Sequence, residues 1–122
     1  MKSFSNLTKL LLISATFFIT CSEDILEVFI PNIANQWESS RGSFFFFSPA
    51  QTDVSESTFT GNEQNGTTDD FTGKFKNYDI EFTFSNGNES GVRYIGKFVK
   101  NSNPLKIDVK GANGVRLILT QN

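Results

Sequence analysis

Few residues in this chain could carry out covalent or metal chemistry. It contains one cysteine, Cys21, and no histidine. Nucleophilic systems with a histidine base, and zinc sites built from histidine or several cysteines, are therefore excluded. Paired carboxylates could still act as acid and base if their surroundings separated their pKa values. The candidate pair, Asp79 and Glu81, shares one face of a predicted strand whose other face is apolar, so we interpret both as solvated surface charges.

Residues 62–70, Asn-Glu-Gln-Asn-Gly-Thr-Thr-Asp-Asp, offer many oxygen ligands. Their spacing does not match the ordered arrangement of acidic and amide side chains that calcium loops use. We interpret the segment as a polar hairpin loop. The sequence thus predicts no metal site, no cofactor and no enzymatic activity.

The first twenty residues have the layout of an export signal. Lys2 and Lys9 give a positive start, residues 10–19 are almost continuously apolar, and the first acidic residue is Glu23. A membrane-spanning helix is the competing interpretation, but the apolar stretch covers about half of the roughly 20 residues that a bilayer requires. We therefore expect residues 1–20 to be a signal peptide.

The end of this leader, Phe18-Ile19-Thr20-Cys21, resembles the lipobox of bacterial lipoproteins. The resemblance implies cleavage before Cys21, a diacylglycerol on the Cys21 thiol, and attachment to a membrane. A lipid also accounts for an unpaired thiol in an exported protein, the alternative being a free thiol after a conventional signal. The next residues, Ser22-Glu23-Asp24, resemble the tag of lipoproteins displayed outside the outer membrane. We expect surface display, with a periplasm-facing anchor as the alternative.

Charge argues against nucleic acid as a partner. Loss of Lys2 and Lys9 with the leader leaves nine basic against thirteen acidic groups, a net charge near −4. Such a surface as a whole has no general attraction for phosphate backbones or anionic lipids. The basic residues of the last three predicted strands lie on the strand face opposite the apolar residues, which favours cross-strand charge pairs and solubilising surface charges. They are Arg93, Lys97, Lys106, Lys110 and Arg116.

After the leader, apolar and polar residues alternate in short stretches, as strands with one buried face do. In residues 78–85, Tyr78, Ile80, Phe82 and Phe84 share one face. Similar stretches are expected at 92–99, 105–110 and 115–120, and less regular strands near 42–48, 54–60 and 69–76.

Turn signals separate these stretches. Asn65-Gly66, Asn86-Gly87 and Asn113-Gly114 suit tight hairpin turns, and Asn103-Pro104 suits the end of a strand. The parity of the apolar residues shifts at Asn77, which predicts a tight turn or a bulge there. Strands joined by such short turns are antiparallel neighbours, so the sequence predicts a meander.

An aromatic-x-Gly echo recurs at Phe59-Thr60-Gly61, Phe71-Thr72-Gly73 and Tyr94-Ile95-Gly96. Glycine suits a strand where the backbone bends sharply or a ring lies across it. From Val54 onward this rhythm resembles the small meander barrels of the lipocalin and avidin type, in which a tryptophan near the position of Trp37 closes the barrel floor. We predict an all-β antiparallel meander forming a small lipocalin-like β-barrel, with a β-sandwich as the alternative. It would occupy residues 33–122, after a lipidated tether at 21–32.

Four consecutive rings, Phe44-Phe45-Phe46-Phe47, would place two rings on each face of a strand. One pair must then be covered, either by residues 25–30 or by a ligand or partner. The candidate contacts are Trp37, Phe45, Phe47 and Tyr94.

We expect a membrane-anchored, non-catalytic binding module for a small apolar ligand, a glycan or a protein. The alternative is a structural or inhibitory lipoprotein with a filled core that acts through its loops. A hollow interior would favour the first of these and a filled interior the second.

Overall fold

A computed structural model describes residues 28–122, and all their regular structure is β-strand. The strands are β1 (Gln36–Ser39), β2 (Phe44–Pro49), β3 (Glu56–Gln64), β4 (Thr68–Lys76), β5 (Asp79–Phe84), β6 (Arg93–Phe98), β7 (Lys106–Gly111) and β8 (Arg116–Gln121). The described range holds no helix that could cross a bilayer.

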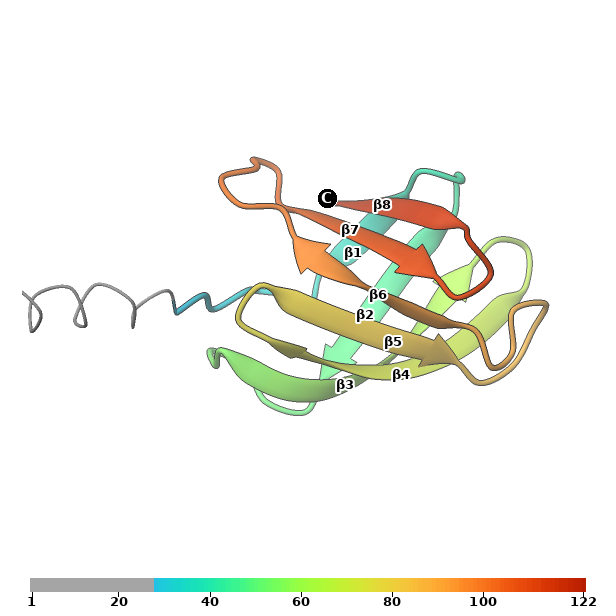
Figure 1. The fold of residues 1–122 in the computed structure, drawn as a ribbon, viewed down its shortest axis with the longest axis horizontal. Coiled ribbons are helices and arrows are strands. Elements are labelled where there is room, and N and C mark those ends of the chain that lie inside the picture. Colours follow the sequence, from blue (N-terminus) through green and yellow to red (C-terminus); the bar gives the residue numbers. More distant parts are fainter. Residues whose placement is uncertain (1–27) are drawn as a thin grey trace, which may run out of the picture.

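Each strand pairs antiparallel with the next, and β8 returns to β1, so the sheet closes into a barrel (Figure 1). The closing pairs run from Trp37 opposite Gln121 to Ser39 opposite Leu119. This arrangement confirms the predicted all-β antiparallel meander and shows a closed barrel in place of a β-sandwich. Closure also removes the free edge strands through which sheets aggregate.

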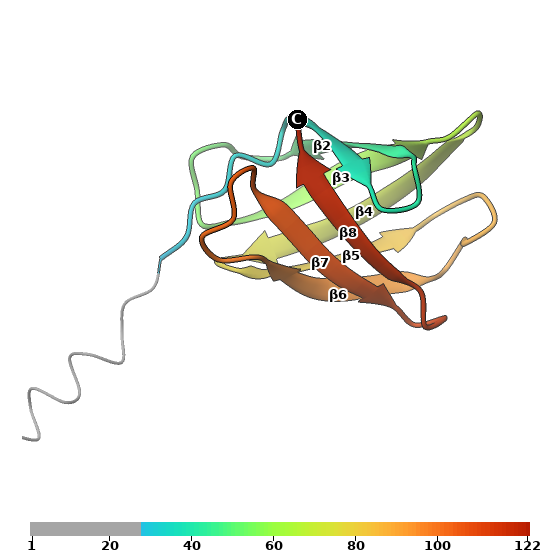
Figure 2. The ribbon, with the colours of Figure 1, turned by 90° about the horizontal axis from the view of Figure 1, so that it is seen from above.

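The connections alternate between the two ends of the barrel (Figures 1 and 2). One end, called here the hairpin end, carries the β1–β2, β3–β4, β5–β6 and β7–β8 connections. The other, called the barrel base, carries the β2–β3, β4–β5 and β6–β7 connections and receives the chain from residue 28. The two ends therefore present different loops.

Seven strands lie where the alternation predicts them, and β1 was not predicted. It has four residues, of which only Trp37 is a strong strand former, and this is too short for alternation to stand out. It exists because β2 and β8 bond to its two sides.

The four-ring run alternates as expected. Phe45 and Phe47 are buried in the barrel, whereas Phe44 is 39% exposed on the outside. Within the segment 25–30 that was expected to cover the outer pair, Phe29 stacks on Tyr78 instead, with ring centroids 4.3 Å apart. Residues 25–27 lie outside the described residues.

Phe71 lies at the centre of the interior. Its ring centroid is between 4.9 and 6.3 Å from those of Phe45, Phe47, Phe59, Phe82 and Phe84. These separations are the tilted and edge-to-face contacts that aromatic pairs prefer. An eight-stranded barrel has room for little more than its own side chains, and here rings fill that room.

The aromatic-x-Gly echo follows from this crowding. A Cβ added at Gly61 would lie 2.5 Å from the Phe71 ring, and one at Gly73 would lie 2.8 Å from the Phe59 ring. At all three glycines the neighbouring strand is nearer still, because the added Cβ would meet the carbonyl oxygen of Phe46 at Gly61, of Glu81 at Gly73 and of Asp108 at Gly96. Glycine stands where a ring or a tightly coiled neighbour occupies the space of a side chain, as the sequence interpretation proposed.

The turns follow the predictions with one exception. Asn77 forms the tight β4–β5 turn with a φ of 51°, and Gly66 takes a φ of 78° between β3 and β4. The connection at Asn86-Gly87 is longer than a tight hairpin and runs over residues 85–92. Its length carries Glu89 across the hairpin end.

The barrel base is closed by the chain that leads into β1. Ile33 is buried there, and its carbonyl oxygen accepts a hydrogen bond from Trp37 Nε1 at 2.9 Å. Phe29 packs farther out, against Tyr78 and Phe98. Trp37, which donates that bond, is fully buried.

Candidate functional site

The four aromatic residues proposed as ligand or partner contacts all lie inside the barrel. Trp37, Phe45 and Tyr94 are 0% exposed, and Phe47 is 3% exposed. The structure brings them into one core, in which Phe47 contacts Trp37 edge-on at 5.9 Å and Tyr94 stacks on Phe82 at 5.4 Å. Their rings contact one another and the other core rings. Only the Tyr94 hydroxyl leaves the apolar interior.

The hairpin end is closed by a polar network that the sequence analysis missed. Arg41, in the β1–β2 connection, makes a two-pronged contact with Glu63 of β3, from Nε at 2.8 Å and from Nη2 at 2.6 Å. Glu63 is 6% exposed and also accepts a hydrogen bond from the Ser43 hydroxyl. A buried carboxylate is tolerated only when charge and hydrogen bonds compensate it, and both are present here.

Glu89 links three parts of the chain at this end. Its carboxylate accepts hydrogen bonds from Arg41 Nη2 at 2.9 Å, from the Tyr94 hydroxyl at 2.6 Å and from Asn113 Nδ2 at 2.8 Å. These donors come from the β1–β2 connection, strand β6 and the β7–β8 connection. The group of Arg41, Glu63, Glu89, Tyr94 and Asn113 is called the hairpin clasp below.

The clasp shifts the acid–base behaviour of its members. Burial and the hydrogen bond to Glu89 raise the pKa of Tyr94 to about 12. Burial alone would raise the pKa of Glu89, but the hydrogen bonds from Arg41, Tyr94 and Asn113 outweigh it and lower that pKa. Glu89 is therefore an anion at neutral pH, engaged with three donors and poorly suited to take up a proton.

A recess of about 260 Å³ opens beside the clasp. Three carboxylates and one guanidinium line it, together with neutral polar side chains. The lining residues are Arg41, Glu63, Asn65, Thr67, Asp69, Asn88 and Glu89. The recess is thus polar, with an excess of negative charge.

A second hollow, the outer groove, lies on the outside of β2–β5 and measures about 610 Å³. Four hydroxyl residues line up across it, because Ser48 pairs with Thr60, Thr60 with Thr72, and Thr72 with Thr83. Adjacent strands lie about 4.8 Å apart, so these side chains form a regular row. The groove combines hydroxyl and methyl groups without a free charge in that row.

The remaining sequence predictions about polar residues can be placed on the barrel. Glu81 pairs with Arg93 and Lys74, and Asp79 pairs with Lys97, so both carboxylates lie in outward charge pairs as expected. Arg116 likewise pairs with Asp108 across β7 and β8.

Residues 62–70 form the ends of β3 and β4 and the turn between them. Within residues 28–122, no group of three or more Cys, Asp or Glu side chains is arranged to hold a metal ion.

One sequence signal could have pointed to the clasp. In β3, Ser57, Phe59, Gly61 and Glu63 share the inward parity, so a carboxylate stands where an apolar residue is expected. A charge at a core position requires a partner. Arg41 and Glu89 lie in connections without periodicity, and no pattern identified them as the partners.

The predicted signal peptide at 1–20, the lipidation site Cys21 and most of the predicted tether at 21–32 lie outside the described residues. Comparisons with protein-family models, curated proteins and solved structures gave no match to this chain. The likeness to lipocalin-type barrels therefore stays a prediction from the strand pattern.

Proposed function

We propose that this chain is a membrane-anchored, non-catalytic binding protein that meets its partner on the outside of a filled barrel. The anchor is the acylated Cys21, and the location is the outer membrane with the barrel facing the cell exterior. A periplasm-facing barrel is the alternative. The export-signal layout, the lipobox-like residues and the single thiol support the anchor.

The observation that carries this function is the filled interior. Rings pack at contact distance around Phe71, Ile33 and Trp37 close the base, and the clasp closes the hairpin end. A small apolar ligand would have to displace these side chains. An exterior contact requires no such rearrangement, which favours the loop-mediated role over an internal ligand.

The hairpin end is the exterior surface that we favour for a protein partner. Because the clasp ties the β1–β2 and β7–β8 connections to β3 and β6, little loop entropy remains to be lost on binding. The acidic recess beside it suits a lysine or arginine side chain of the partner, by charge complementarity.

A glycan is the second candidate partner, and the outer groove favours it. The Ser48, Thr60, Thr72 and Thr83 hydroxyls can both donate and accept hydrogen bonds, as sugar hydroxyls do. The threonine methyl groups offer apolar contact to the C–H faces of a sugar ring.

The anchor is tested by expressing the full chain in a bacterium that processes lipoproteins and measuring the mass of the mature N-terminal peptide. We expect a peptide that begins at Cys21 and carries diacylglyceryl mass, and a protein that partitions into the detergent phase. Cys21→Ser should abolish both results, whereas the neighbouring Ser22→Ala should change neither. An unmodified cysteine in the mature wild-type protein would refute the anchor.

The favoured surface is tested by NMR titration of the protein with acetyl-arginine amide, using acetyl-glutamine amide as the neutral control. We expect amide shifts to concentrate at Asn65, Thr67 and Asn88 with the cationic probe only. Asp69→Asn, which removes one recess charge outside the clasp, should weaken the response. Equal shifts with both probes, or shifts confined to the outer groove, would contradict the hairpin-end assignment. A glycan array tests the groove directly.

A further inference from the structure

The barrel base carries a cluster of exposed apolar side chains. Val28 is 67% exposed, Ile30 is 55% exposed and Val99 is 37% exposed. They lie at the same end of the barrel, because Phe29 lies between the first two in sequence and packs on Phe98, the residue before Val99. Three large apolar side chains are thus presented to solvent where the chain joins the barrel.

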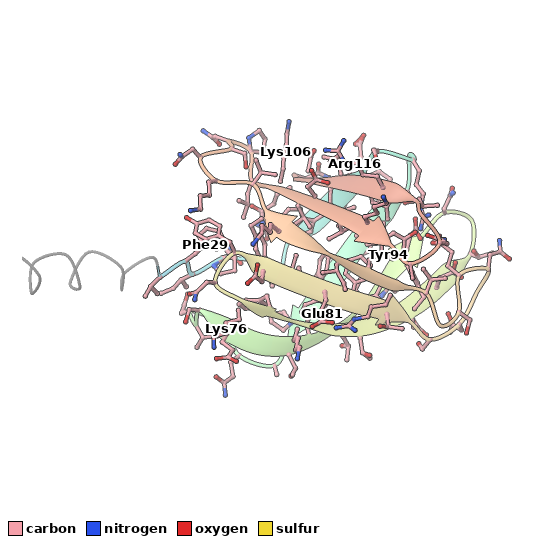
Figure 3. The ribbon with its side chains drawn as sticks, viewed as in Figure 1. Phe29, Lys76, Glu81, Tyr94, Lys106 and Arg116 are labelled. Atoms are coloured by element: carbon pink, nitrogen blue, oxygen red, sulfur yellow. The ribbon has the colours of Figure 1, made fainter. Side chains whose placement is uncertain are left out.

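Basic side chains border this cluster. Lys106 begins β7 and lies opposite Val99, whose N–H donates to the Lys106 carbonyl oxygen at 2.9 Å. The Lys100 ammonium lies over the Tyr78 ring, 4.7 Å from its centroid. Figure 3 shows Phe29 and Lys106 toward the side where the chain enters the barrel. Val28, Ile30, Val99, Lys100 and Lys106 are called the base patch below.

The described acidic groups of the base lie in the β2–β3 connection, at the start of β3, or in charge pairs. Asp53 is in the β2–β3 connection and Glu56 begins β3, opposite Lys76. Asp79 is engaged by Lys97. Asp108 lines the same recess as Val99 and Lys100 and is likewise engaged, by Arg116. The β6–β7 side of the base therefore exposes apolar side chains and Lys106 beside carboxylates that are already paired, although the mature chain is acidic as a whole.

We propose that the base patch rests on the anionic lipid surface of the membrane that holds the anchor. Cys21 precedes Val28 by seven residues, which span at most roughly 25 Å when fully extended. This inference rests on the proposed acylation of Cys21, which would hold the base, and not the hairpin end, beside the bilayer. Apolar side chains flanked by lysines suit the interface between anionic headgroups and acyl chains. The hairpin clasp would then point away from the membrane.

The orientation is tested on the acylated full chain in vesicles of phosphatidylethanolamine and phosphatidylglycerol. Nitroxide labels are placed at Val99→Cys and, as a matched control, at Val115→Cys, which is also 37% exposed but lies at the hairpin end. We expect the label at 99 to gain oxygen accessibility and lose access to a water-soluble nickel chelate, and the label at 115 to behave as in water. Equal nickel access at both positions, or protection at 115 alone, would overturn the proposal.

Charge reversal gives an independent readout. Lys106→Glu should reduce the population with a protected label at 99 by a factor of about five or more, since a basic side chain near an anionic surface contributes about that factor. Lys110→Glu, on the same strand and at the same outward parity but nearer the hairpin end, should leave it unchanged. Equal effects of the two reversals would overturn the role of the patch.

Mass spectrometry of the same preparation separates the two proposals. An acylated Cys21 with equally exposed labels refutes the orientation alone. An unmodified Cys21 refutes the anchor, and the orientation that rests on it falls too.

Discussion

Replacing Phe45 with alanine should destabilise the barrel by about 3–5 kcal/mol, the usual cost of removing a fully buried phenylalanine ring. Phe45 is 0% exposed, and its ring lies 5.7 Å from Phe71 and 6.1 Å from Phe82, so the cavity has rigid aromatic walls that cannot easily collapse. Folding free energies of small domains are about 5–15 kcal/mol, so the loss would be a large part of the total.

The adjacent residue gives the matched control. Phe44 belongs to the same strand but is 39% exposed on the outer face, so Phe44→Ala should cost about 1 kcal/mol or less. Both substitutions lose the same strand preference, and the difference between them isolates burial. Urea unfolding followed by Trp37 fluorescence measures both values. Phe45→Leu serves if the alanine variant does not fold.

Equal destabilisation at positions 44 and 45 would refute the account of the filled interior. So would a Phe45→Ala variant as stable as the wild type, because it would show that the interior already contained free volume.

Three further predictions concern crowding and the clasp. Gly96→Ala should prevent stable folding or cost more than about 3 kcal/mol, because the new methyl group would meet backbone atoms. Gly91→Ala, which has open space but a φ of 84°, should cost about 1–2 kcal/mol. Thermal unfolding compares the stabilities of the two variants. Absorbance titration should show a tyrosine that ionises near pH 12 in the wild type and is absent in Tyr94→Phe. Because the folded pKa of Tyr94 is raised from 10.0, the stability that the neutral hydroxyl contributes is lost as pH rises through about 12. Ionisation of Tyr94 near pH 10 would contradict the clasp. Because the pKa of Glu89 is lower in the folded than in the unfolded protein, its carboxylate contributes stability at pH values above the unfolded pKa, and this stability is lost as pH falls through the folded pKa. Glu89→Gln should therefore make the free energy of unfolding less dependent on pH in the acid range. An unchanged pH dependence would disprove this.

Much of the fold could be predicted from local pattern. Apolar and polar residues alternate so regularly over residues 78–85 that a strand with one buried face could be predicted. The shift in the parity of the apolar residues located the turn at Asn77. The recurring aromatic-x-Gly steps anticipated the close packing at Gly61 and Gly73. These features depend on residues near in sequence, where spacing carries the information.

The features that escaped prediction depend on contacts between distant residues. The strand around Trp37 is defined by its neighbours and not by its own pattern. The hydrogen bond between Arg41 and Glu89 joins two loops whose residues are 48 positions apart. Neither loop has a periodic residue pattern from which this contact could be predicted. For the same reason the aromatic residues predicted as ligand or partner contacts could not be distinguished from core residues by sequence alone.

The pairing of β1 with β8 has a consequence for how the chain reaches this structure. Successive strands are joined by short or moderate connections and can zip together one hairpin at a time, but Ser40 must find Ile118, 78 residues away, before the ring is complete. A chain that crosses a membrane N-terminus first presents β1 long before β8 arrives. During that interval the sheet has two unpaired edge strands that can pair with other chains. Under the proposed export, the incomplete sheet would therefore need protection at these two edges until β8 pairs with β1.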